Sequence, residues 1–525
     1  MRTSPNPWVR RLLAALNGLL AGFAALAVAE LVAAAVRPQA SPVVAVGGAA
    51  IDRTPTPVKD FAIRHFGEND KLVLQLGILA TLAALAVVLG LIALRHRGTG
   101  SAGVLLFGAV GAAAALSRPD STGIADALPS LAGAVAGAGV LYWLTGRLTR
   151  PATHEGADPG EDGWDRRGFL VAASAAALAS AGTGALGRYL NSTSGQNAIA
   201  SRNAVRLPPA ASPAAPVPAG ARLGIPGISS FFTPNGDFYR VDTALVVPRV
   251  DATTWRLRIH GQGVARPLSL SFEDLLRRQL IERDITLTCV SNEIGGPYIG
   301  NARWIGVRLA DLLREAGVKP PSQGGLADQL VARSVDAMTI GSPVETVMDG
   351  RDAMLAVGMN GQPLPFEHGF PVRMLVPGLY GYVSACKWIQ DIELTTFAAY
   401  DPYWVQRGWA RRGPIKTESR IDTPKPFAGP RAGTVMVAGV AWAQHRGIER
   451  VEVRVDDGPW NPADLATQDT LDTWRQWSYR WNATPGTHSL TVRATDGTGQ
   501  TQTSTRTDTF PDGASGWHSV VVTVT

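Results

Sequence analysis

The sequence contains only two cysteines, Cys289 and Cys386, among its 525 residues. A secreted domain held together by disulfides normally has more cysteines at shorter spacing, which argues against that class, although a single bridge stays open. The chain also lacks a dense block of Lys or Arg, and its formal net charge is only +6. We therefore expect no nucleic acid among its partners.

Apolar residues are distributed unevenly along the chain. Residues 1–190 contain long runs of Ala, Leu, Gly and Val, whereas residues 220–525 read as ordinary soluble protein with most of the Trp, Asp, Glu and Arg. A chain of this length also exceeds what one hydrophobic core normally supports. The sequence therefore predicts a multi-domain protein.

Five apolar segments stand out in the first part of the chain, at about residues 12–36, 72–94, 102–117, 127–144 and 168–187. Most approach the roughly 20 residues that a membrane-spanning helix needs, although the third and fourth are short. In lipid the backbone must satisfy its own hydrogen bonds, which favours helices. We predict a transmembrane region of about five helices over 1–190, with a re-entrant stretch as the alternative for the third.

Charge predicts the orientation of these segments. Arg2, Arg10 and Arg11 precede the first one and favour a cytoplasmic N-terminus. Five crossings then place everything after about residue 190 outside the cytoplasm. We therefore predict a multi-pass protein of a bacterial cell membrane with extracytoplasmic domains. Glu30, late in the first segment, is interpreted as reaching the membrane surface rather than as a functional group.

A pair of arginines precedes the fifth segment. The stretch Asp165-Arg166-Arg167-Gly168-Phe169-Leu170 resembles a twin-arginine translocation signal, which directs the export of proteins that have already folded around a cofactor. A chance Arg pair at a cytoplasmic helix end is the alternative. Residues 191–227, first Asn/Ser-rich and then Pro/Ala-rich, are predicted to form an extended, semi-rigid linker.

Histidine is absent from all five apolar segments, since the histidines of this region are His65, His96 and His154. A haem b in a membrane domain normally takes two histidine ligands from facing helices. We therefore predict no haem.

Beyond the linker, residues 255–260 alternate as a strand does, and Ser271 is a plausible N-cap for a helix over 272–276. Residues 285–289 alternate again, so that Cys289 ends a strand before a Gly-rich turn. Such a loop mouth is a usual place for chemistry. A buried structural cysteine is the alternative for Cys289.

A second group of candidates lies in a Gly/Pro-rich stretch between residues 359 and 388. Closely spaced Gly and Pro build an irregular backbone that approaches a ligand closely. His368, Arg373 and Lys387 in this stretch are donors suited to a phosphate.

The last part of the chain shows short alternating segments, with Val451, Val453 and Val455 separated by charged residues and a similar pattern over 488–494. Short strands with regular turns predict an all-β, immunoglobulin-like sandwich over 421–525.

Taken together, residues 228–525 resemble the sulfite oxidase family of molybdenum enzymes. The resemblance rests on the strand that ends in Cys289 with Asn292 after it, on residues 304–309, on the stretch 359–373 and on Lys387-Trp388. It implies an α+β molybdopterin-binding catalytic domain over 228–420 and a dimerisation domain over 421–525. It also implies one molybdenum–molybdopterin cofactor with a single pterin. A monomeric β module packed on the catalytic domain is the alternative to a homodimer.

The resemblance also assigns residues. Cys289 is the implied metal ligand and a catalytic residue, and soft thiolate ligation suits such a metal centre. Arg240 and Trp304 match the other catalytic positions, with Trp304 at the substrate pocket. The implied cofactor-binding residues are Tyr239, Asn292, His368, Arg373 and Lys387. The role of Asp242, which stands where sulfite oxidases have His, stays open, and Cys386 is interpreted as a packing residue.

One departure concerns the substrate. Glu293 follows the cysteine where sulfite oxidases carry residues that lead to a sulfite-binding arginine, and a carboxylate there repels a dianion. The predicted function is oxygen-atom transfer on a small sulfur compound, with electrons passed to an external carrier in or near the membrane. A sulfoxide reductase of the same fold and a non-catalytic surface-binding protein are the alternatives.

Overall fold

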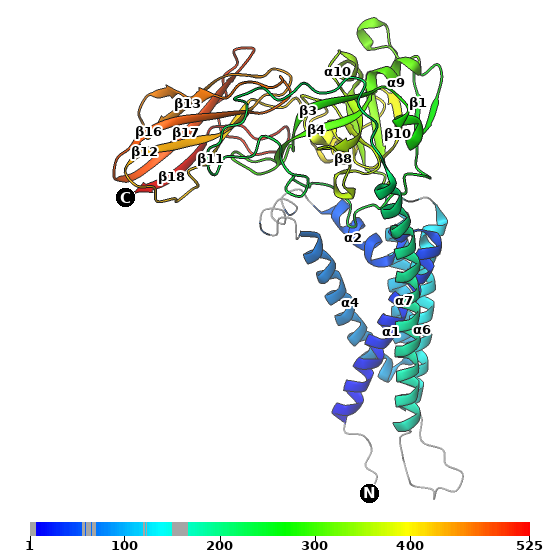
Figure 1. The fold of residues 1–525 in the computed structure, drawn as a ribbon. Helices are drawn as coiled ribbons and strands as arrows, with labels where there is room; N and C mark the ends of the chain where they lie inside the picture. Colours follow the sequence, from blue (N-terminus) through cyan, green and yellow to red (C-terminus); the bar gives the residue numbers. More distant parts are fainter. Residues whose placement is uncertain are drawn as a thin grey trace, which may run out of the picture. The chain divides into compact units, whose positions relative to one another are not determined.

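A computed structural model describes residues 7–54, 58, 65, 70–118, 121, 123–149 and 166–525. The chain divides into two compact units, one of residues 1–197 with 243–247 and the other of residues 198–242 with 248–525. The first unit contains helices and the second contains the β-sheets (Figure 1).

The helical elements are α1 (Pro7–Val36), η1 (Pro38–Ala40), α2 (Pro42–Arg53), α4 (Asp70–Arg95), α5 (Arg97–Leu116), η3 (Ile124–Ala127), α6 (Leu128–Thr149) and α7 (Arg166–Ala204). Among the described residues, five helices are long and apolar enough to cross a membrane: Pro7–Val36, Leu72–Arg95, Arg97–Leu116, Ile124–Thr149 and Arg167–Ala204. These helices cover the five predicted apolar segments, including the third, for which a re-entrant stretch was the alternative.

Small residues set the packing of these helices. A Cβ atom on Gly18 of α1 would lie 1.9 Å from the carbonyl oxygen of Ala86 in α4, and one on Gly133 of α6 would lie 2.4 Å from that of Ala25 in α1. Only glycine leaves room for two backbones to approach this closely. The Ala/Gly-rich composition of the region thus determines which helix faces meet.

The structure corrects the predicted linker over 191–227. Residues 191–204 continue helix α7, because their Ala, Gln, Asn and Arg residues are compatible with helix and the apolar segment before them has already nucleated it. The rest of the stretch packs on the second unit, where the Ser212 N–H donates to the carbonyl of Leu280. Helix α2 lies between the first two predicted apolar segments, where no element was predicted from the sequence.

The predicted twin-arginine signal falls at the beginning of α7, and its first residue, Asp165, lies outside the described residues. Its role as an export signal stays a prediction.

Two sheets form the first part of the second unit. One has the order β2-β1-β10-β5-β6, with β1 and β10 parallel, and the other has the order β3-β4-β7-β8, with β9 paired to β7. Their strands are β1 (Arg256–Gly261), β2 (Leu268–Ser271), β3 (Leu280–Thr288), β4 (Ile299–Arg308), β5 (Gln329–Ser334), β6 (Thr339–Pro343), β7 (Met354–Met359), β8 (Gln362–Pro363), β9 (Arg373–Leu375) and β10 (Ile389–Thr395). The short helices between them are α8 (Phe272–Leu276), α9 (Leu309–Glu315), η4 (Pro321–Gln323), α10 (Val344–Met348), η5 (Phe366–His368), α11 (Gly381–Ser384) and η6 (Val405–Arg407).

Local predictions in this region are confirmed. Ser271 caps α8 through a capping box with Asp274, in which each side chain bonds the backbone N–H of the other residue. Strands β1 and β3 lie where alternation predicted them. Ile285 and Leu287 are buried in the core that both sheets share. Cys289 directly follows the last residue of β3.

The C-terminal part consists of two four-stranded antiparallel sheets. One has the order β11-β12-β16-β15 and the other β14-β13-β17-β18. Their bounds are β11 (Glu418–Thr423), β12 (Gly433–Trp442), β13 (Ile448–Val455), β14 (Trp460–Pro462), β15 (Asp464–Leu465), β16 (Arg475–Ala483), β17 (Gly486–Asp496) and β18 (His518–Val524). Val437, Trp477, Val453 and Val492, two from each sheet, contribute to one buried cluster. The all-β prediction is confirmed, and the immunoglobulin-like assignment stays a prediction.

Candidate active site

Cys289 is buried directly after β3, at the start of a tight loop that returns to β4. Its N–H donates to the carbonyl of Tyr298 at 2.9 Å, and its own carbonyl accepts from the N–H of Asn292 at 3.1 Å. Burial raises the pKa of the thiol, while hydrogen bonds with Ser291 and the positive charge of Lys387 oppose that shift. A rigid loop and a nearby cation suit a cysteine that binds a metal as thiolate.

Asn292 holds this loop together and also has an unused donor. Its Oδ1 accepts from the N–H of Tyr298 at 2.8 Å, which closes the turn. Its Nδ2 is buried and has no hydrogen-bond partner among the described residues. A buried amide without a partner is costly, so this N–H₂ group fits a site that receives an acceptor from a bound molecule.

Arg373 is the side chain of the site that most directly indicates a bound ligand. It begins β9, it is buried, and its guanidinium lies 5.5 Å from the ring centroid of Trp304. Its Nη1 donates to the carbonyl of His368 at 3.5 Å, and its Nε has no partner within the described part of the chain. Burial lowers the pKa of Arg373. A buried guanidinium with so few partners fits an anionic ligand.

His368 lies next to Arg373 and carries an uncharged imidazole ring. Its Nε2 lies 2.9 Å from the carbonyl oxygen of Asn235, and a carbonyl only accepts, so this nitrogen donates its hydrogen. Burial and the charge of Arg373 lower the pKa of His368 to about 4. The nearby Gly369 has φ 111°, and a Cβ there would lie 3.1 Å from the backbone of Lys387. The Gly-rich backbone therefore brings these donors together.

Lys387 and Arg240 meet at one carboxylate. Lys387 Nζ lies 2.7 Å from Asp242 Oδ2, and Arg240 Nε lies 3.2 Å from the same oxygen. Lys387 Nζ also donates to the carbonyl of Glu367 at 3.1 Å. Asp242, whose role the sequence left open, therefore holds both cations in place.

Aromatic rings pack together within this cluster. Phe238 packs against Tyr239, Trp304 and His368, with ring centroids between 5.2 and 5.8 Å apart. Trp304 is fully buried, and its ring N–H donates to the carbonyl of Ile285 at 3.1 Å. Burial and the neighbouring Cys289 raise the pKa of the Tyr239 phenol. The predicted position of Trp304 at a substrate pocket stays a prediction.

The structure thus brings most predicted site residues into one neighbourhood: Tyr239, Cys289, His368, Arg373 and Lys387 are linked by direct contacts or by their charges. Cys386 is buried beside them as a free cysteine, and its Sγ lies 3.7 Å from the carbonyl oxygen of Lys387.

Sequence reasoning missed the contribution of the C-terminal sheets. The side chain of Gln444 donates to the carbonyl of Thr286 and to the hydroxyl of Thr288, directly before Cys289. Arg420 donates to the carbonyl of Gly296 at 2.6 Å. These contacts fix β3 and the loop after Cys289. They join residues that are more than one hundred positions apart, so no local sequence pattern predicts them.

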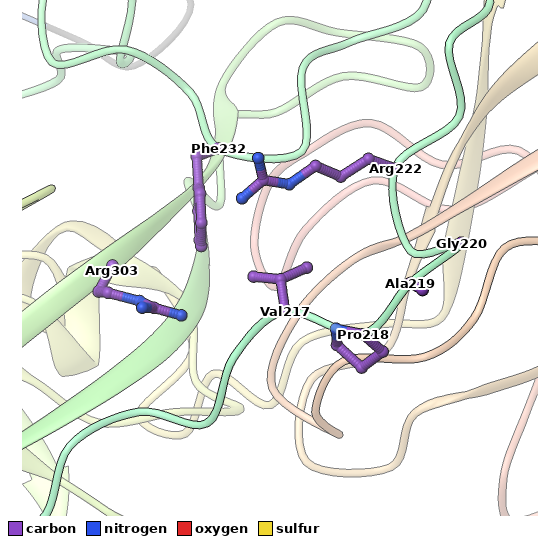
Figure 2. A pocket seen from close by; sticks show the side chains of 7 residues that line it. All are labelled: Val217, Pro218, Ala219, Gly220, Arg222, Phe232 and Arg303. Atoms are coloured by element: carbon purple, nitrogen blue, oxygen red, sulfur yellow. The ribbon is translucent and has the colours of Figure 1, made fainter.

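A hollow of about 410 Å³ lies elsewhere on this unit, lined by Val217, Pro218, Ala219, Gly220, Arg222, Phe232 and Arg303 (Figure 2). Arg303 precedes Trp304 on β4, and consecutive strand residues point to opposite faces of a sheet. Arg303 is also engaged by Asp284 through two bonds of 2.7 Å. This hollow is therefore separate from the cluster around Arg373.

Comparisons with known proteins agree with this geometry. A family model described as an oxidoreductase molybdopterin binding domain matches residues 244–404. The mitochondrial sulfite oxidase of Mus musculus is 30% identical over 291 residues, which cover 48% of this chain and 53% of that protein. An uncharacterized oxidoreductase of Bacillus subtilis, YuiH, is 33% identical over 163 residues, which cover 31% of this chain and 76% of that protein.

Among solved structures, the sulfane dehydrogenase SoxCD of Paracoccus pantotrophus aligns with a TM-score of 0.47 at 28% identity, covering 52% of this chain and 75% of that one.

The geometry, the family model and the sequence relatives define a molybdopterin-binding oxidoreductase. The chain belongs to the sulfite oxidase family of molybdopterin-dependent oxidoreductases. The predicted family, enzyme class and molybdenum–molybdopterin cofactor are thereby confirmed. The chain spans about half the length of the curated sulfite oxidases it matches.

The residues present fit this cofactor. Buried, unpartnered donors on Asn292 and Arg373 are what an anionic, hydrogen-bonding ligand requires. Among the described residues no cluster of three or more His, Cys, Asp or Glu side chains is placed to hold a metal ion. A metal bound through Cys289 therefore suits a cofactor that brings further sulfur ligands of its own.

Proposed function

We propose that the protein is a membrane-anchored molybdenum oxidoreductase that acts outside the cytoplasm by oxygen-atom transfer on a small sulfur compound. The observation that carries the proposal is the buried Arg373 guanidinium, whose Nε has no partner in the described structure, in the same cluster as Cys289. Tyr239 links the two, since Cys289 and Arg373 both lie close enough to its phenol to influence its pKa. When bound, the cofactor supplies the metal that exchanges an oxygen atom with the substrate and electrons with a carrier.

The chain's own residues have distinct roles in this proposal. Cys289 provides the thiolate for the metal, and Asn292 keeps its loop closed. Arg373 and Lys387 hold the pterin and its phosphate, one by a planar fork and the other as a point charge. His368, neutral at physiological pH because its pKa lies near 4, orients the same backbone without adding charge.

Two observations favour a neutral substrate, such as a sulfoxide, over the sulfite dianion. Glu293, four residues after Cys289, is exposed and brings negative charge to the loop. Arg240, a predicted catalytic residue, shares the carboxylate of Asp242 with Lys387, which offsets part of its charge. A dianion gains less in such surroundings than in an arginine-rich pocket. Sulfoxide reduction is therefore the second candidate activity.

Location and partners belong to the same proposal. Five helices of sufficient length and apolarity support membrane anchoring. The arginines of the N-terminal flank support a cytoplasmic start, and hence sheets outside the cytoplasm. An electron carrier in or near the membrane completes the reaction. Homodimerisation through the C-terminal sheets rests on the family resemblance.

The test is metal content. The full-length protein is produced in a host that makes the molybdenum cofactor, and molybdenum per chain is measured for the wild type and for Cys289→Ser. Near-stoichiometric metal in the wild type is expected, with loss of the thiolate signature and of activity by at least about a thousandfold in the variant, because the ligand itself is removed. Assays with sulfite and with sulfoxides then separate the two activities.

A wild-type chain without molybdenum, from a host that loads a control enzyme, would reject the proposal and favour a non-catalytic surface-binding protein. Metal whose spectrum is the same in Cys289→Ser would reject the thiolate assignment alone.

A further inference from the structure

The helical unit has a large apolar groove, here called the chamber, which is partly open at its surface: Leu19, Phe23 and Val73, which line it, are exposed. It has a volume of about 820 Å³ and is lined by residues of α1, α2, α4, α5 and α6, among them Leu26, Val46, Ile78, Leu82, Phe107 and Leu141. This volume falls within the roughly 300–1,000 Å³ of small-molecule sites. Nearly every lining side chain is apolar, so the chamber suits a hydrophobic occupant.

The packing of α1 against α4 explains why the chamber exists. The two helices touch where Gly18 and Gly90 allow backbone contact: a Cβ on Gly90 would lie 2.2 Å from the carbonyl oxygen of Ala14. From this crossing α4 diverges from α1 toward α2 (Figure 1). A Cβ on Gly77 of α4, which lines the chamber, would meet nothing within 4 Å. Gly77 is exposed, so the diverging helices leave a groove that is open at this position.

One end of the chamber carries a polar group without a partner. Ser130, in the first turn of α6, lines the chamber and is buried, and its hydroxyl has no hydrogen-bond partner among the described residues. This hydroxyl faces Gly111 of α5, where a Cβ would lie 2.8 Å from it. A buried hydroxyl without a partner is costly, so Ser130 fits a site that receives an acceptor from a bound molecule.

Further polar groups are close in sequence to residues that line the chamber, although they do not line it themselves. Asp126, four residues before Ser130, is fully buried and pairs with Arg37 through bonds of 2.8 and 2.9 Å. Glu30 accepts a hydrogen bond from Ser41, and both adjoin chamber residues, Ala29 and Pro42. Ionisable groups are expensive inside a membrane region and commonly mark a functional site. Glu30 is thus hydrogen-bonded to Ser41, a contact that its interpretation as a residue reaching the membrane surface did not include.

We propose that this chamber binds an isoprenoid quinone, with its ring toward Ser130 and its tail along the apolar walls. The inference rests on the proposed function, because it identifies the electron carrier of a membrane-anchored oxidoreductase. The head of a quinone is uncharged and offers carbonyl acceptors, which matches one free hydroxyl. An anionic phospholipid head would need a cation, and Arg37 is engaged by Asp126 in two bonds.

The test uses the full-length protein in nanodiscs of phosphatidylcholine, titrated with menaquinone-4, a short-chain isoprenoid quinone. Bound quinone and bound phospholipid are quantified by mass spectrometry, and molybdenum is measured in the same samples. Gly77→Phe fills the chamber without a backbone clash. Gly139→Phe is the matched control, because Gly139 is an exposed helical glycine of α6 that does not line the chamber and whose Cβ would also meet nothing within 4 Å.

We expect saturable binding of one quinone per wild-type chain and of the same quantity by Gly139→Phe. Gly77→Phe is expected to weaken binding at least about tenfold, since the occupant loses its volume. Ser130→Ala, which creates no steric change, is expected to weaken it about fivefold through the lost hydrogen bond.

Equal binding by wild type and Gly77→Phe, or chambers that contain phospholipid only, would overturn the inference. The molybdenum measurement separates the two proposals. A molybdenum-loaded chain that binds no quinone rejects this site alone, and a quinone-binding chain without molybdenum rejects the proposed function.

Discussion

The helical unit and the β-sheet unit of this chain are held together in different ways. In the helical unit, backbones touch directly, as at Gly18, where a Cβ would lie 1.9 Å from the Ala86 carbonyl oxygen. In the β-sheet unit, large rings such as Trp304, Trp388 and Trp442 are fully buried. Close contact of small residues is typical of helices in lipid, where association brings no hydrophobic gain. In water, the burial of large apolar area stabilises a fold.

Unpartnered polar atoms sharpen this contrast. In the β-sheet unit, those on Asn292 and Arg373 flank Cys289 or belong to its cluster, and the cofactor explains them. In the helical unit, Ser130 lines a chamber, and Asn17 is buried with neither amide atom bonded to the described chain. Other buried atoms of the β-sheet unit that lack a partner among the described residues, such as Glu418 Oε1 and Trp477 Nε1, lie outside the candidate site, so a bound ligand accounts for only some of these atoms.

The largest effect is expected from Arg373→Met. Cofactor affinity should fall about a hundredfold, because charge-assisted hydrogen bonds to the pterin are lost. The cofactor-free protein should become more stable by about 1–3 kcal/mol, because a buried charge with few partners is removed. Molybdenum loading and urea unfolding of the apoprotein measure the two effects.

Arg258→Met serves as the control, because Arg258 is two-thirds exposed and pairs with Asp391 at the surface. Unchanged loading in Arg373→Met would show that the guanidinium does not hold the cofactor.

A substitution in the helical unit tests the other side of the comparison. Gly18→Ala introduces a Cβ into backbone contact with α4, and we expect the helical unit to lose about 2 kcal/mol of stability in detergent. Gly77→Ala, into open space, should leave stability unchanged or raise it slightly. Thermal loss of ellipticity at 222 nm compares the two, and equal midpoints would contradict the close-contact account.

The smallest effect is a pH dependence in the β-sheet unit. Burial raises the pKa of Glu418 to about 8, from an ordinary value of 4.5. Between these values the folded state binds one proton more than the unfolded state, so the free energy of unfolding falls as pH rises. The slope is at most about 1.4 kcal/mol per pH unit.

Glu418→Gln should remove this slope, and the exposed Glu449→Gln should keep it. Urea unfolding followed by tryptophan fluorescence between pH 5 and pH 8 decides between the two. An unchanged slope in Glu418→Gln would assign the pH dependence to another group.

Much of the local structure was predictable from the sequence. The five helices follow from continuous apolar runs, and β1, β3, β13 and β17 follow from alternation. The capping box at Ser271 follows from its acidic neighbour three positions on. These features depend on residues close together in the chain, where periodicity carries the information.

Other features were not predictable. Residues 191–204 have a linker-like composition, yet they extend α7, because a helix already formed costs little to prolong. Helix α2, between the first two apolar segments, was not predicted either. The role of Asp242 also needed the structure, since only the fold brings Lys387, 145 positions away, to the carboxylate that Arg240 also contacts.

The sequence by itself determined the class of this protein, because Cys289, His368, Arg373 and Lys387 stand in motifs whose residue types suit a thiolate-bound, phosphate-carrying cofactor. It also determined the five apolar helices, because their length and composition are local properties. The tertiary structure alone decided which donors near Cys289 lack partners, how the C-terminal sheets hold its loop, and where the helices leave a chamber. Those features arise from contacts between distant segments, and such contacts follow from packing rather than from any local pattern.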